Sequence, residues 1–237
     1  MIQFLIIVPC YNASLNLDTL ITSVMTQSYT LWNMILVDDL SDDSTIEKIE
    51  EYSRKDARIT GYRNTEKKFA LRNIVENARK AQSDSSTVIA VIDGDDSLCN
   101  NDALEILAVS YSKGFDVCWT MHRWDTDGRN ISRDMPSTVD PYSYPWASSH
   151  FRTFRASLLK KIHDDNFKNH LGEWFKRGYD QALLLPVLSR TTRRKFIPVV
   201  CYQYNINSVS MPVRNWTEHD QIATVNFVRA RGFVSGR

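Results

Sequence analysis

Three groups of polar residues have the types and spacing needed to hold a cation and a phosphate. They are Pro9-Cys10-Tyr11-Asn12, Asp38-Asp39 and Asp93-Gly94-Asp95-Asp96. Carboxylates gathered in one place repel one another, and a divalent cation with oxygen ligands offsets that repulsion. Such a cation keeps open positions for water and phosphate oxygens, so it could neutralise a diphosphate leaving group. Gly94 lets the backbone turn sharply and come close to a ligand, so Asp93 and Asp95 could face one site.

Apolar segments with the periodicity of strands and helices position these groups. The expected strands are 2–8, 32–37, 59–62, 88–92 and 115–121. The helices expected between them are 17–25, 44–52, 71–78 and 104–111. Strands and helices that alternate at this spacing predict an α/β fold with a mostly parallel central sheet flanked by helices. Since parallel strands end at one edge of a sheet, the three groups should converge there on a concave acidic rim.

Aspartates that follow strands also form turns and cap helices, which is the competing interpretation of these groups. Asp42, Asp43 and Ser44 are interpreted in that way, because residues 44–47 have the spacing of a capping box that opens a helix. A single aspartate after a strand would favour this structural role. Three groups at the ends of three strands favour a binding site instead.

The second half of the chain has a different pattern. From about Arg123 onward the alternation stops, and residues 135–146 are rich in Pro, Tyr and Ser. Further helical patterns are found at 156–162, 180–188 and 218–230. Without a repeat or a linker, the simplest prediction is a single domain over residues 1–237, with a sheet half at 1–98 and a more irregular half at 99–237.

Composition excludes several classes of protein. The 237 residues carry 29 Lys plus Arg against 28 Asp plus Glu, so nothing indicates a nucleic-acid partner. The longest apolar run, Phe4–Pro9, is far shorter than the roughly 20 residues of a membrane-spanning helix, and no signal peptide surrounds it. The cysteines are widely spaced and form no Cys-x-x-Cys pair. We therefore expect reduced, buried thiols and a cytoplasmic location.

The motifs of the first half resemble those of the family 2 glycosyltransferases, which have the GT-A fold. The resemblance covers about residues 1–125. It rests on Val8-Pro9-Cys10-Tyr11-Asn12, Gln27-Ser28-Tyr29, Ile35-Leu36-Val37-Asp38-Asp39-Leu40-Ser41, Ala70-Leu71-Arg72-Asn73 and Val91-Ile92-Asp93-Gly94-Asp95-Asp96. These motifs occur in the family's order and spacing, whereas Asp-x-Asp alone would be weak. The resemblance implies transfer of a sugar, with inversion, from a nucleoside diphosphate, preferably uridine diphosphate, to an acceptor hydroxyl.

The resemblance also assigns roles in the first half. Tyr11 and Asp39 would hold the nucleobase, Tyr11 by stacking and Asp39 by accepting a hydrogen bond from a ring N–H. Arg72 would lie near the nucleotide, and Pro9 would shape the first loop. Asp38 is interpreted as structural, because it can satisfy backbone donors around that loop.

The acidic motif would meet the ribose and the diphosphate. Asp93 would sit near the ribose beside Gly94, and Asp95 would ligate Mn²⁺ or Mg²⁺ that bridges the diphosphate. Two departures concern the loops around the nucleotide. The family usually has Gly where Leu40 stands, and it usually has another Gly where Lys67-Lys68-Phe69 precede the Ala-x-Arg-Asn segment.

The second half, here the acceptor-binding half, matches a smaller branch of the family more loosely. Asp180 stands where such enzymes have the general base for the acceptor hydroxyl; its alternative role is the N-cap of a helix that begins at Gln181. His150 could be a further metal or phosphate ligand, or a hydrogen-bonded structural histidine. Trp124, Trp146 and Trp174 are candidates for packing against an acceptor sugar, with core packing as the alternative.

One basic run and two competing functions remain. Arg190, Arg193, Arg194 and Lys195 are interpreted as a solvated helix end, with contact to anionic lipid or to a lipid-diphosphate acceptor as the alternative. A sugar-nucleotide pyrophosphorylase would need a Gly-rich loop after the first strand, and residues 9–15 contain no glycine. A non-catalytic nucleotide-sugar-binding module is disfavoured by the intact acidic motif at 93–96.

Overall fold

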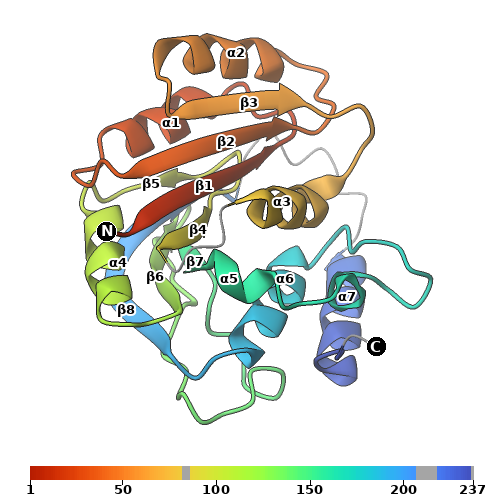
Figure 1. The fold of residues 1–237 in the computed structure, drawn as a ribbon. Helices are drawn as coiled ribbons and strands as arrows, with labels where there is room; N and C mark the ends of the chain where they lie inside the picture. The colour runs from red at the N-terminus through yellow and green to blue at the C-terminus, as the bar shows by residue number, and fades with distance from the viewer. Residues whose placement is uncertain (82–85, 207–217, 236–237) are drawn as a thin grey trace.

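One mixed sheet contains the strands of both halves of the chain. The structure is a computed structural model that describes residues 1–81, 86–206 and 218–235. Within these residues, eight strands follow the order β3-β2-β1-β4-β7-β6-β8-β5 (Figure 1). The strands are β1 (Gln3–Cys10), β2 (Trp32–Asp38), β3 (Ile59–Arg63), β4 (Thr87–Val91), β5 (Ser97–Leu98), β6 (Val117–Trp124), β7 (Arg152–Arg155) and β8 (Arg194–Tyr204).

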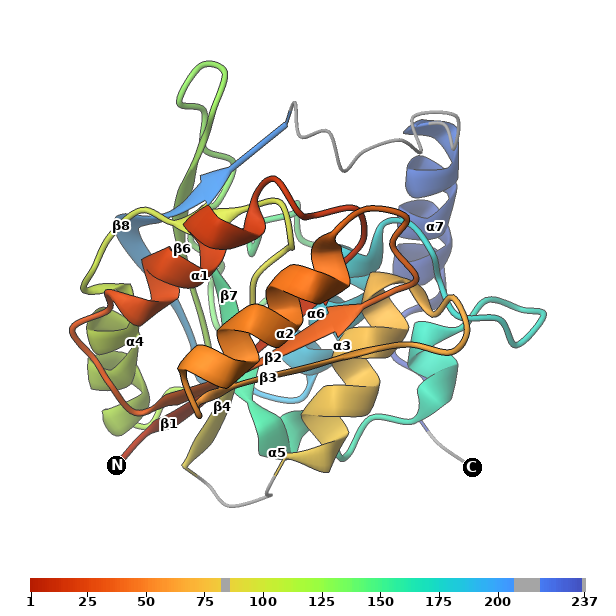
Figure 2. The ribbon, with the colours of Figure 1, turned by 90° about the horizontal axis from the view of Figure 1, so that it is seen from above.

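Helices cover both faces of this sheet (Figure 2). They are α1 (Leu17–Met25), α2 (Thr45–Lys55), α3 (Phe69–Lys80), α4 (Ala103–Ser112), α5 (Ala156–Leu159), the 3-10 helix η1 (Asp164–Phe167), α6 (Tyr179–Ser189) and α7 (Glu218–Arg231). The apolar residues of α1, α2 and α4 pack in one core cluster, whereas those of α3, α5, α6 and α7 pack in another. Side chains alternate along β1, so Ile6 faces the first cluster and Ile7 the second.

The first four strands form the parallel part that the sequence predicts. β1 pairs in parallel with β2 and β4, and β2 pairs in parallel with β3. β4 is buried over its whole length, as expected for a β-branched strand with helices on both faces. The predicted α/β fold is confirmed, and the strand ends that carry the polar groups lie at one edge.

The second half adds strands that the sequence analysis missed. β7 lies between β4 and β6 and is antiparallel to both. β8 runs parallel to β6 and antiparallel to the two-residue strand β5. These strands are short or rich in polar residues, so their apolar periodicity is weak.

Two local predictions are confirmed in part. Ser44 is the N-cap of α2 but accepts no capping hydrogen bond; instead Asp43 Oδ1 accepts from the Thr45 backbone N–H at 3.1 Å. The run from Arg190 to Lys195 begins as the solvated helix end that was expected, because Arg190 is the exposed C-cap of α6, but it continues into β8 from Arg194. Arg193 pairs with the buried Asp116 at 2.9 Å. Among the described helices, none has the length and apolarity required to cross a membrane.

Candidate active site

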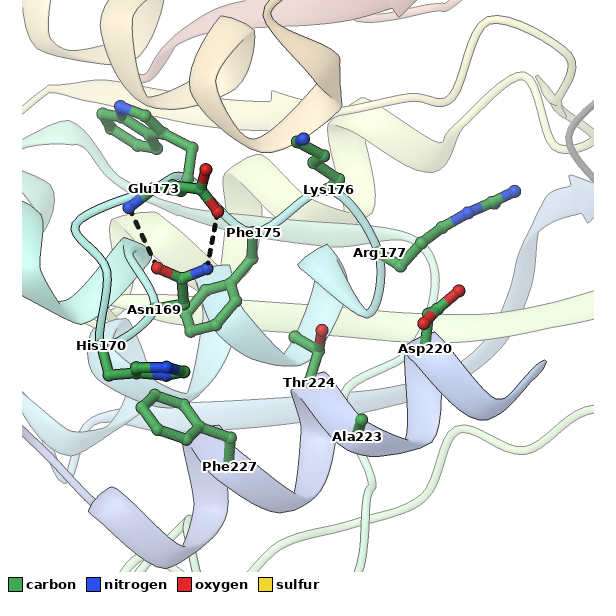
Figure 3. A pocket seen from close by; sticks show the side chains of 11 residues that line it. Asn169, His170, Glu173, Phe175, Lys176, Arg177, Asp220, Ala223, Thr224 and Phe227 are labelled. Carbon is green, nitrogen blue, oxygen red and sulfur yellow. Dashed lines mark hydrogen bonds between the residues drawn. The ribbon is translucent and has the colours of Figure 1, made fainter. Parts of the chain in front are cut away.

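Two cavities lie beside each other, and one of them collects most of the predicted site residues. The first, of about 410 Å³, lies at the carboxyl ends of β1, β2 and β4. Eight residues that the sequence predicts as site residues line this cavity: Pro9, Tyr11, Asp39, Asp93, Gly94, Asp95, His150 and Asp180. The second, of about 660 Å³, lies between residues 169–177 and α7 (Figure 3). The acidic groups therefore converge on one hollow, to which the second half of the chain also contributes.

Gly94 is needed for close packing between the first loop and the acidic motif. A Cβ atom at this position would lie 2.9 Å from the Pro9 carbonyl oxygen and 3.2 Å from the Cys10 Cα. The backbone of Gly94 is not in the left-handed region. The expected turn is present, since the Asp96 backbone N–H donates to the Asp93 carbonyl oxygen at 2.9 Å, and the glycine also lets the two loops touch.

Asp39 anchors the start of α3 as well as lining the cavity. Its Oδ1 accepts from the Lys68 backbone N–H and its Oδ2 from that of Phe69, each at 2.8 Å. Asn64 Nδ2 also donates to Oδ1 at 2.7 Å. A carboxylate is favoured at a helix N-terminus because the helix dipole is positive there. A nucleobase at Asp39 would have to share oxygens that already accept these bonds.

Lys67 is a cavity residue to which the sequence analysis gave no function. Its ammonium lies 2.9 Å from the centre of the Tyr11 ring and donates to the Asp39 carbonyl oxygen at 2.7 Å. Burial lowers the pKa of Lys67, although the nearby Asp39 opposes this effect. Lys67 covers one face of Tyr11, so a base stacked on that ring would use its other face or displace the ammonium. The only sequence signal was the departure from the family at residues 67–69.

Both departures from the family fall on left-handed backbone. Leu40 has a φ of 60° and Phe69 a φ of 61°. Glycine adopts this conformation readily, whereas side chains with a Cβ are strained there. The backbone has thus kept the turns that the family usually builds with glycine. Asp38 stabilises the first of them, since its Oδ1 accepts from the Ser41 backbone N–H at 3.0 Å.

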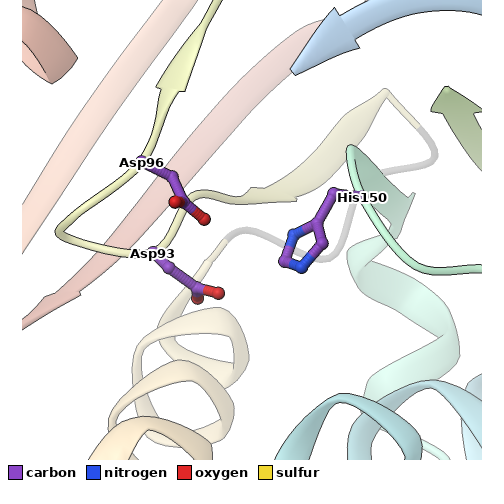
Figure 4. A group of neighbouring side chains, drawn as sticks. All are labelled: Asp93, Asp96 and His150. Atoms are coloured by element: carbon purple, nitrogen blue, oxygen red, sulfur yellow. The ribbon is translucent and has the colours of Figure 1, made fainter. Parts of the chain in front are cut away.

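Asp93, Asp96 and His150 form a compact group at the cavity (Figure 4). One ligand atom from each lies within 4.8 Å of the others. These atoms already have partners. Arg152 Nη2 donates to Asp93 Oδ2 at 3.2 Å and lies 3.0 Å from His150 Nδ1. Asp96 accepts from the Tyr202 hydroxyl and from the Asn205 backbone N–H, each at 2.8 Å.

A buried cation already contacts this group. Burial raises the pKa of Asp96 well above its ordinary value, and the nearby carboxylates of Asp95 and Asp93 add to this. Burial and the neighbouring Arg152 guanidinium hold the pKa of His150 well below its usual range. Arg152, which is 1% exposed, then offsets the charge of Asp93. A divalent ion at the centre of this group would stand against a buried cation, so the group fits a metal poorly.

Asp95 fits a cation better than that group does. It is only partly buried and lines the cavity beside Gly94. Mg²⁺ in particular is commonly held by one or two carboxylates, with waters and phosphate oxygens at its other positions. A single carboxylate on an open wall therefore suits an ion that arrives with a diphosphate.

Tyr179 connects the second half to the acidic motif and places Asp180 on the cavity wall. The Tyr179 hydroxyl donates to Asp93 Oδ1. The N-cap of α6 is Gly178, with a φ of 61°, so Asp180 is the second residue of the helix and its alternative role as an N-cap is wrong. Within the described ranges, no hydrogen bond to the Asp180 carboxylate is found. This carboxylate can therefore accept a proton from a ligand in the cavity.

Four predicted site residues lie outside this cavity. Arg72 pairs with Glu66 at 3.0 Å and with Glu76 at 2.7 Å. The other three are tryptophans: Trp124 donates to His122 Nε2, Trp146 packs partly buried against the second core cluster, and Trp174 lines the second cavity.

Arg152 is the least expected member of the site. It lines the cavity and contacts Asp93, His150 and Tyr179, yet its Nε and Nη1 have no hydrogen-bond partner. The sequence signal was an arginine in a short strand of mixed polar and apolar residues, next to the His150 segment. An arginine in such a place needs a buried anion, and the sequence did not indicate which one.

Known glycosyltransferases resemble this chain in sequence. A family model described as glycosyl transferase family 2 matches residues 5–173. An uncharacterised glycosyltransferase of Haemophilus influenzae is 39% identical over 98 residues, 40% of this chain and 37% of the relative. The UDP-Glc:alpha-D-GlcNAc-diphosphoundecaprenol beta-1,3-glucosyltransferase WfgD of Escherichia coli is 34% identical over 102 residues, 38% of this chain and 34% of the relative. The chain thus matches well under two thirds of these relatives' lengths.

Solved structures share the fold. S. aureus TarS 1–349 in complex with UDP superposes with a TM-score of 0.72 at 19% identity, over 97% of this chain and 65% of that chain. The mannosyltransferase PcManGT from Pyrobaculum calidifontis, in complex with GDP-Man and Mn²⁺, gives a TM-score of 0.66 at 14% identity, over 99% and 66%. At these identities the likeness shows the fold. Together with the family model, which covers most of its length, it shows that the chain belongs to glycosyl transferase family 2 and has the GT-A fold.

Proposed function

We propose that this chain transfers a sugar, with inversion, from a UDP sugar to an acceptor hydroxyl with the help of Mn²⁺ or Mg²⁺. One observation carries the proposal. Asp95, which suits a metal bound to a diphosphate, and Asp180, which accepts no hydrogen bond within the described residues, line the same cavity of about 410 Å³. That volume is within the usual range for a small-molecule site.

The first half would bind the donor. The nucleobase would lie between Tyr11 and the Asp39 loop, with Pro9 and Gly94 setting the spacing of the loops. Asp93 would accept from the ribose hydroxyls. Asp95 would hold the divalent ion, which when bound supplies charge neutralisation for the diphosphate.

Asp180 would act as the general base in the acceptor half. The acceptor oxygen would bond to the sugar C1 while the C1–O bond to the diphosphate breaks. Its proton would pass to Asp180, and the bonding pair would leave with the nucleoside diphosphate. Attack opposite the leaving group inverts C1.

The solved relatives support the donor class. TarS is known in complex with UDP and with UDP-GlcNAc, and PcManGT is known in complex with GDP-Man and Mn²⁺. We propose a uridine nucleotide on the TarS likeness, and a metal on the likeness to PcManGT. The roles that the sequence suggests for Arg72, Trp124 and Trp146 gain no support from the cavity, because these residues lie outside it. The ligand role suggested for His150 gains none either, because His150 already contacts Arg152.

Two other predictions are part of the proposal. The chain would act as a single domain in the cytoplasm, where nucleotide sugars are available. The halves 1–98 and 99–237 would not fully separate donor binding from acceptor binding, because His150, Arg152 and Tyr179 of the second half line the proposed donor cavity. The pyrophosphorylase alternative still lacks its Gly-rich loop, and a non-catalytic module would not need Asp180.

Three measurements on the full chain test the proposal. UDP with Mn²⁺ should raise the melting temperature, and UDP with EDTA should raise it much less, since a ligand of the native state stabilises it by mass action. Slow hydrolysis of the UDP sugar by water should also need the metal. Asp95→Asn should lose the metal effect. Asp180→Asn should keep UDP binding but lower kcat for transfer about 10²- to 10⁴-fold.

Three results would contradict the proposed function. If Asp180→Asn transfers sugar at a near-normal rate, Asp180 is not the base. If UDP gives no thermal shift with any divalent ion while other nucleotides do, the donor class is wrong. Release of pyrophosphate from a sugar 1-phosphate and a nucleoside triphosphate would favour the pyrophosphorylase.

A further inference from the structure

The acidic motif at residues 93–96 is held in shape by side chains that lie outside the proposed donor cavity. Its turn closes through the hydrogen bond from the Asp96 backbone N–H to the Asp93 carbonyl oxygen. The turn brings three carboxylates together and contains Gly94, whose residue type loses the most backbone freedom on folding. Charge repulsion and chain entropy therefore both favour an open turn. Contacts from elsewhere in the chain must oppose them.

Tyr202 of β8 joins the two ends of this turn, Asp93 and Asp96, which are drawn in Figure 4. Its hydroxyl accepts from the Asp93 backbone N–H at 3.0 Å and donates to Asp96 Oδ2 at 2.8 Å. The Tyr202 side chain is fully buried, and its ring is stacked on His150 with 4.7 Å between ring centres. Because packing fixes the ring, the hydroxyl is fixed as well, and β8 sets the spacing of the two ends of the turn.

Asn16, close to the other end of the sequence, holds the carbonyl group of Asp95. Asn16 Nδ2 donates to this oxygen at 2.9 Å, and Asn205 Nδ2 donates to it as well. Asn16 is the N-cap of α1, where an asparagine usually accepts from its own helix, but within the described residues it makes no such bond. Its amide is used for the acidic motif instead. A rotation of the Asp95 peptide that moved its side chain along the cavity wall would break both bonds.

Tyr202 and Asn16 both lie outside the lining of the cavity in which a nucleotide would bind. They can therefore act on a ligand only through the turn, by fixing where Asp95 stands. Groups that orient a metal ligand without touching the metal commonly change metal affinity about 10- to 100-fold when they are removed. The two side chains have the placement that such groups require.

We infer that Tyr202 and Asn16 are positioning residues that fix Asp95 for the divalent ion. This inference rests on the proposed function, in which Asp95 holds an ion that accompanies the donor diphosphate. Metal and nucleotide would then each bind more tightly in the presence of the other. Loss of a positioning residue would weaken this coupling and leave the affinity for the nucleotide without metal unchanged.

The test measures the Kd of the full chain for UDP by calorimetry, once with Mn²⁺ and once with EDTA. The ratio of the two Kd values gives the coupling between metal and nucleotide. Tyr202→Phe keeps the stacked ring and removes the hydroxyl alone. It should lower the ratio about tenfold and leave the Kd in EDTA unchanged.

Tyr111→Phe is the matched control for the loss of a buried hydroxyl. Tyr111 is 1% exposed and lies outside the lining of the cavity. Its hydroxyl also accepts from a backbone N–H, that of Cys118 at 3.2 Å, and donates to a side-chain oxygen, Thr153 Oγ1 at 2.8 Å. Tyr111→Phe should therefore lower the melting temperature to a similar extent and leave the ratio unchanged.

Asn16→Ser is a second variant that should fold even if Tyr202→Phe does not. Serine is a good N-cap for α1, and Asn205 still donates to the Asp95 carbonyl oxygen, so no buried acceptor loses all its partners. The ratio should fall about threefold or more, as expected for the loss of one hydrogen bond.

Four results would overturn the inference. A ratio that neither Tyr202→Phe nor Asn16→Ser changes means that these side chains do not set the metal site. An equal fall in Tyr111→Phe assigns the effect to general loss of stability. A weaker Kd in EDTA at an unchanged ratio means that Tyr202 acts on the nucleotide alone. A ratio of one in the unaltered chain contradicts the metal of the proposed function, and the inference with it, whereas the first three results leave that function intact.

Discussion

Strands β1, β2 and β4 bring carboxylates to the proposed donor cavity, whereas β7 and the segment before α6 bring cations to it. Asp39, Asp93 and Asp95 come from the first group, and Arg152, Lys176 and Arg177 come from the second. The acidic edge is partly neutralised by the protein before any ligand binds. In the proposed function, a divalent ion would be needed only where Arg152 does not reach, which is the side of Asp95.

The largest expected effect comes from removing the cation that joins the two groups. Arg152→Met leaves the largely buried charge of Asp93 without its cation, so we expect the free energy of unfolding to fall by about 3 kcal/mol. Urea denaturation measures this. The double variant Asp93→Asn/Arg152→Met should recover part of the loss. Arg58→Met is the matched control, because Arg58 pairs with Asp56 far from the cavity and should cost about 1 kcal/mol or less. A loss below that of the control would show that the two groups are not coupled through Arg152.

An effect of intermediate size is expected in the pH dependence of stability, and it comes from His122. Trp124 Nε1 donates to His122 Nε2 at 3.1 Å, so Nδ1 carries the proton and donates to Ser132 Oγ at 3.2 Å. Burial lowers the pKa of His122 to about 4, and Arg152 adds to this. Below pH 6.5, the approximate pKa of histidine in the unfolded chain, His122 binds a proton in the unfolded chain but not in the folded chain. The free energy of unfolding therefore falls from about pH 6.5 down to about pH 4.

Urea denaturation across this range measures the effect. Allowing for solvent screening, His122 should contribute about 1–2 kcal/mol of the loss. His122→Gln should flatten the pH slope, with the buried His150 responsible for part of what remains. The exposed His219 provides the control, since His219→Gln should leave the slope unchanged. If the pH dependence of stability is the same in His122→Gln, His122 takes up its proton in the folded chain at the same pH as in the unfolded chain.

The smallest effect lies in the turns of the acidic half. Leu40→Gly should relieve roughly 1–2 kcal/mol of left-handed strain, and glycine costs roughly 0.5–1 kcal/mol in chain entropy. We expect a net gain of up to about 1 kcal/mol, seen as a rise in melting temperature of about 2–4 °C. The sign is informative: a clear destabilisation would show that packing of the Leu40 side chain outweighs the backbone strain.

The first half was largely predictable because its signals are local. The strand at residues 88–92 is a buried β-branched run, and the acidic motif follows it directly, so the sequence alone places Asp93 and Asp95 at a strand end. The departures at Leu40 and at 67–69 marked the positions of unusual backbone. The second half was less predictable. β7 is four residues long, and β8 includes charged residues, so neither has a clear period.

Residue types and order by themselves determined the α/β fold and the convergence of three polar groups, whereas the candidate base Asp180 came from the resemblance to the family. Only the tertiary structure decided which charges meet: that Arg152 lies between Asp93 and His150, that Lys67 covers Tyr11, and that Arg72 turns to Glu66 and Glu76. The physical reason is the range of the interactions. Strand and helix patterns repeat over a few residues, whereas the partner of a buried charge can be any residue that the fold brings within a few ångströms.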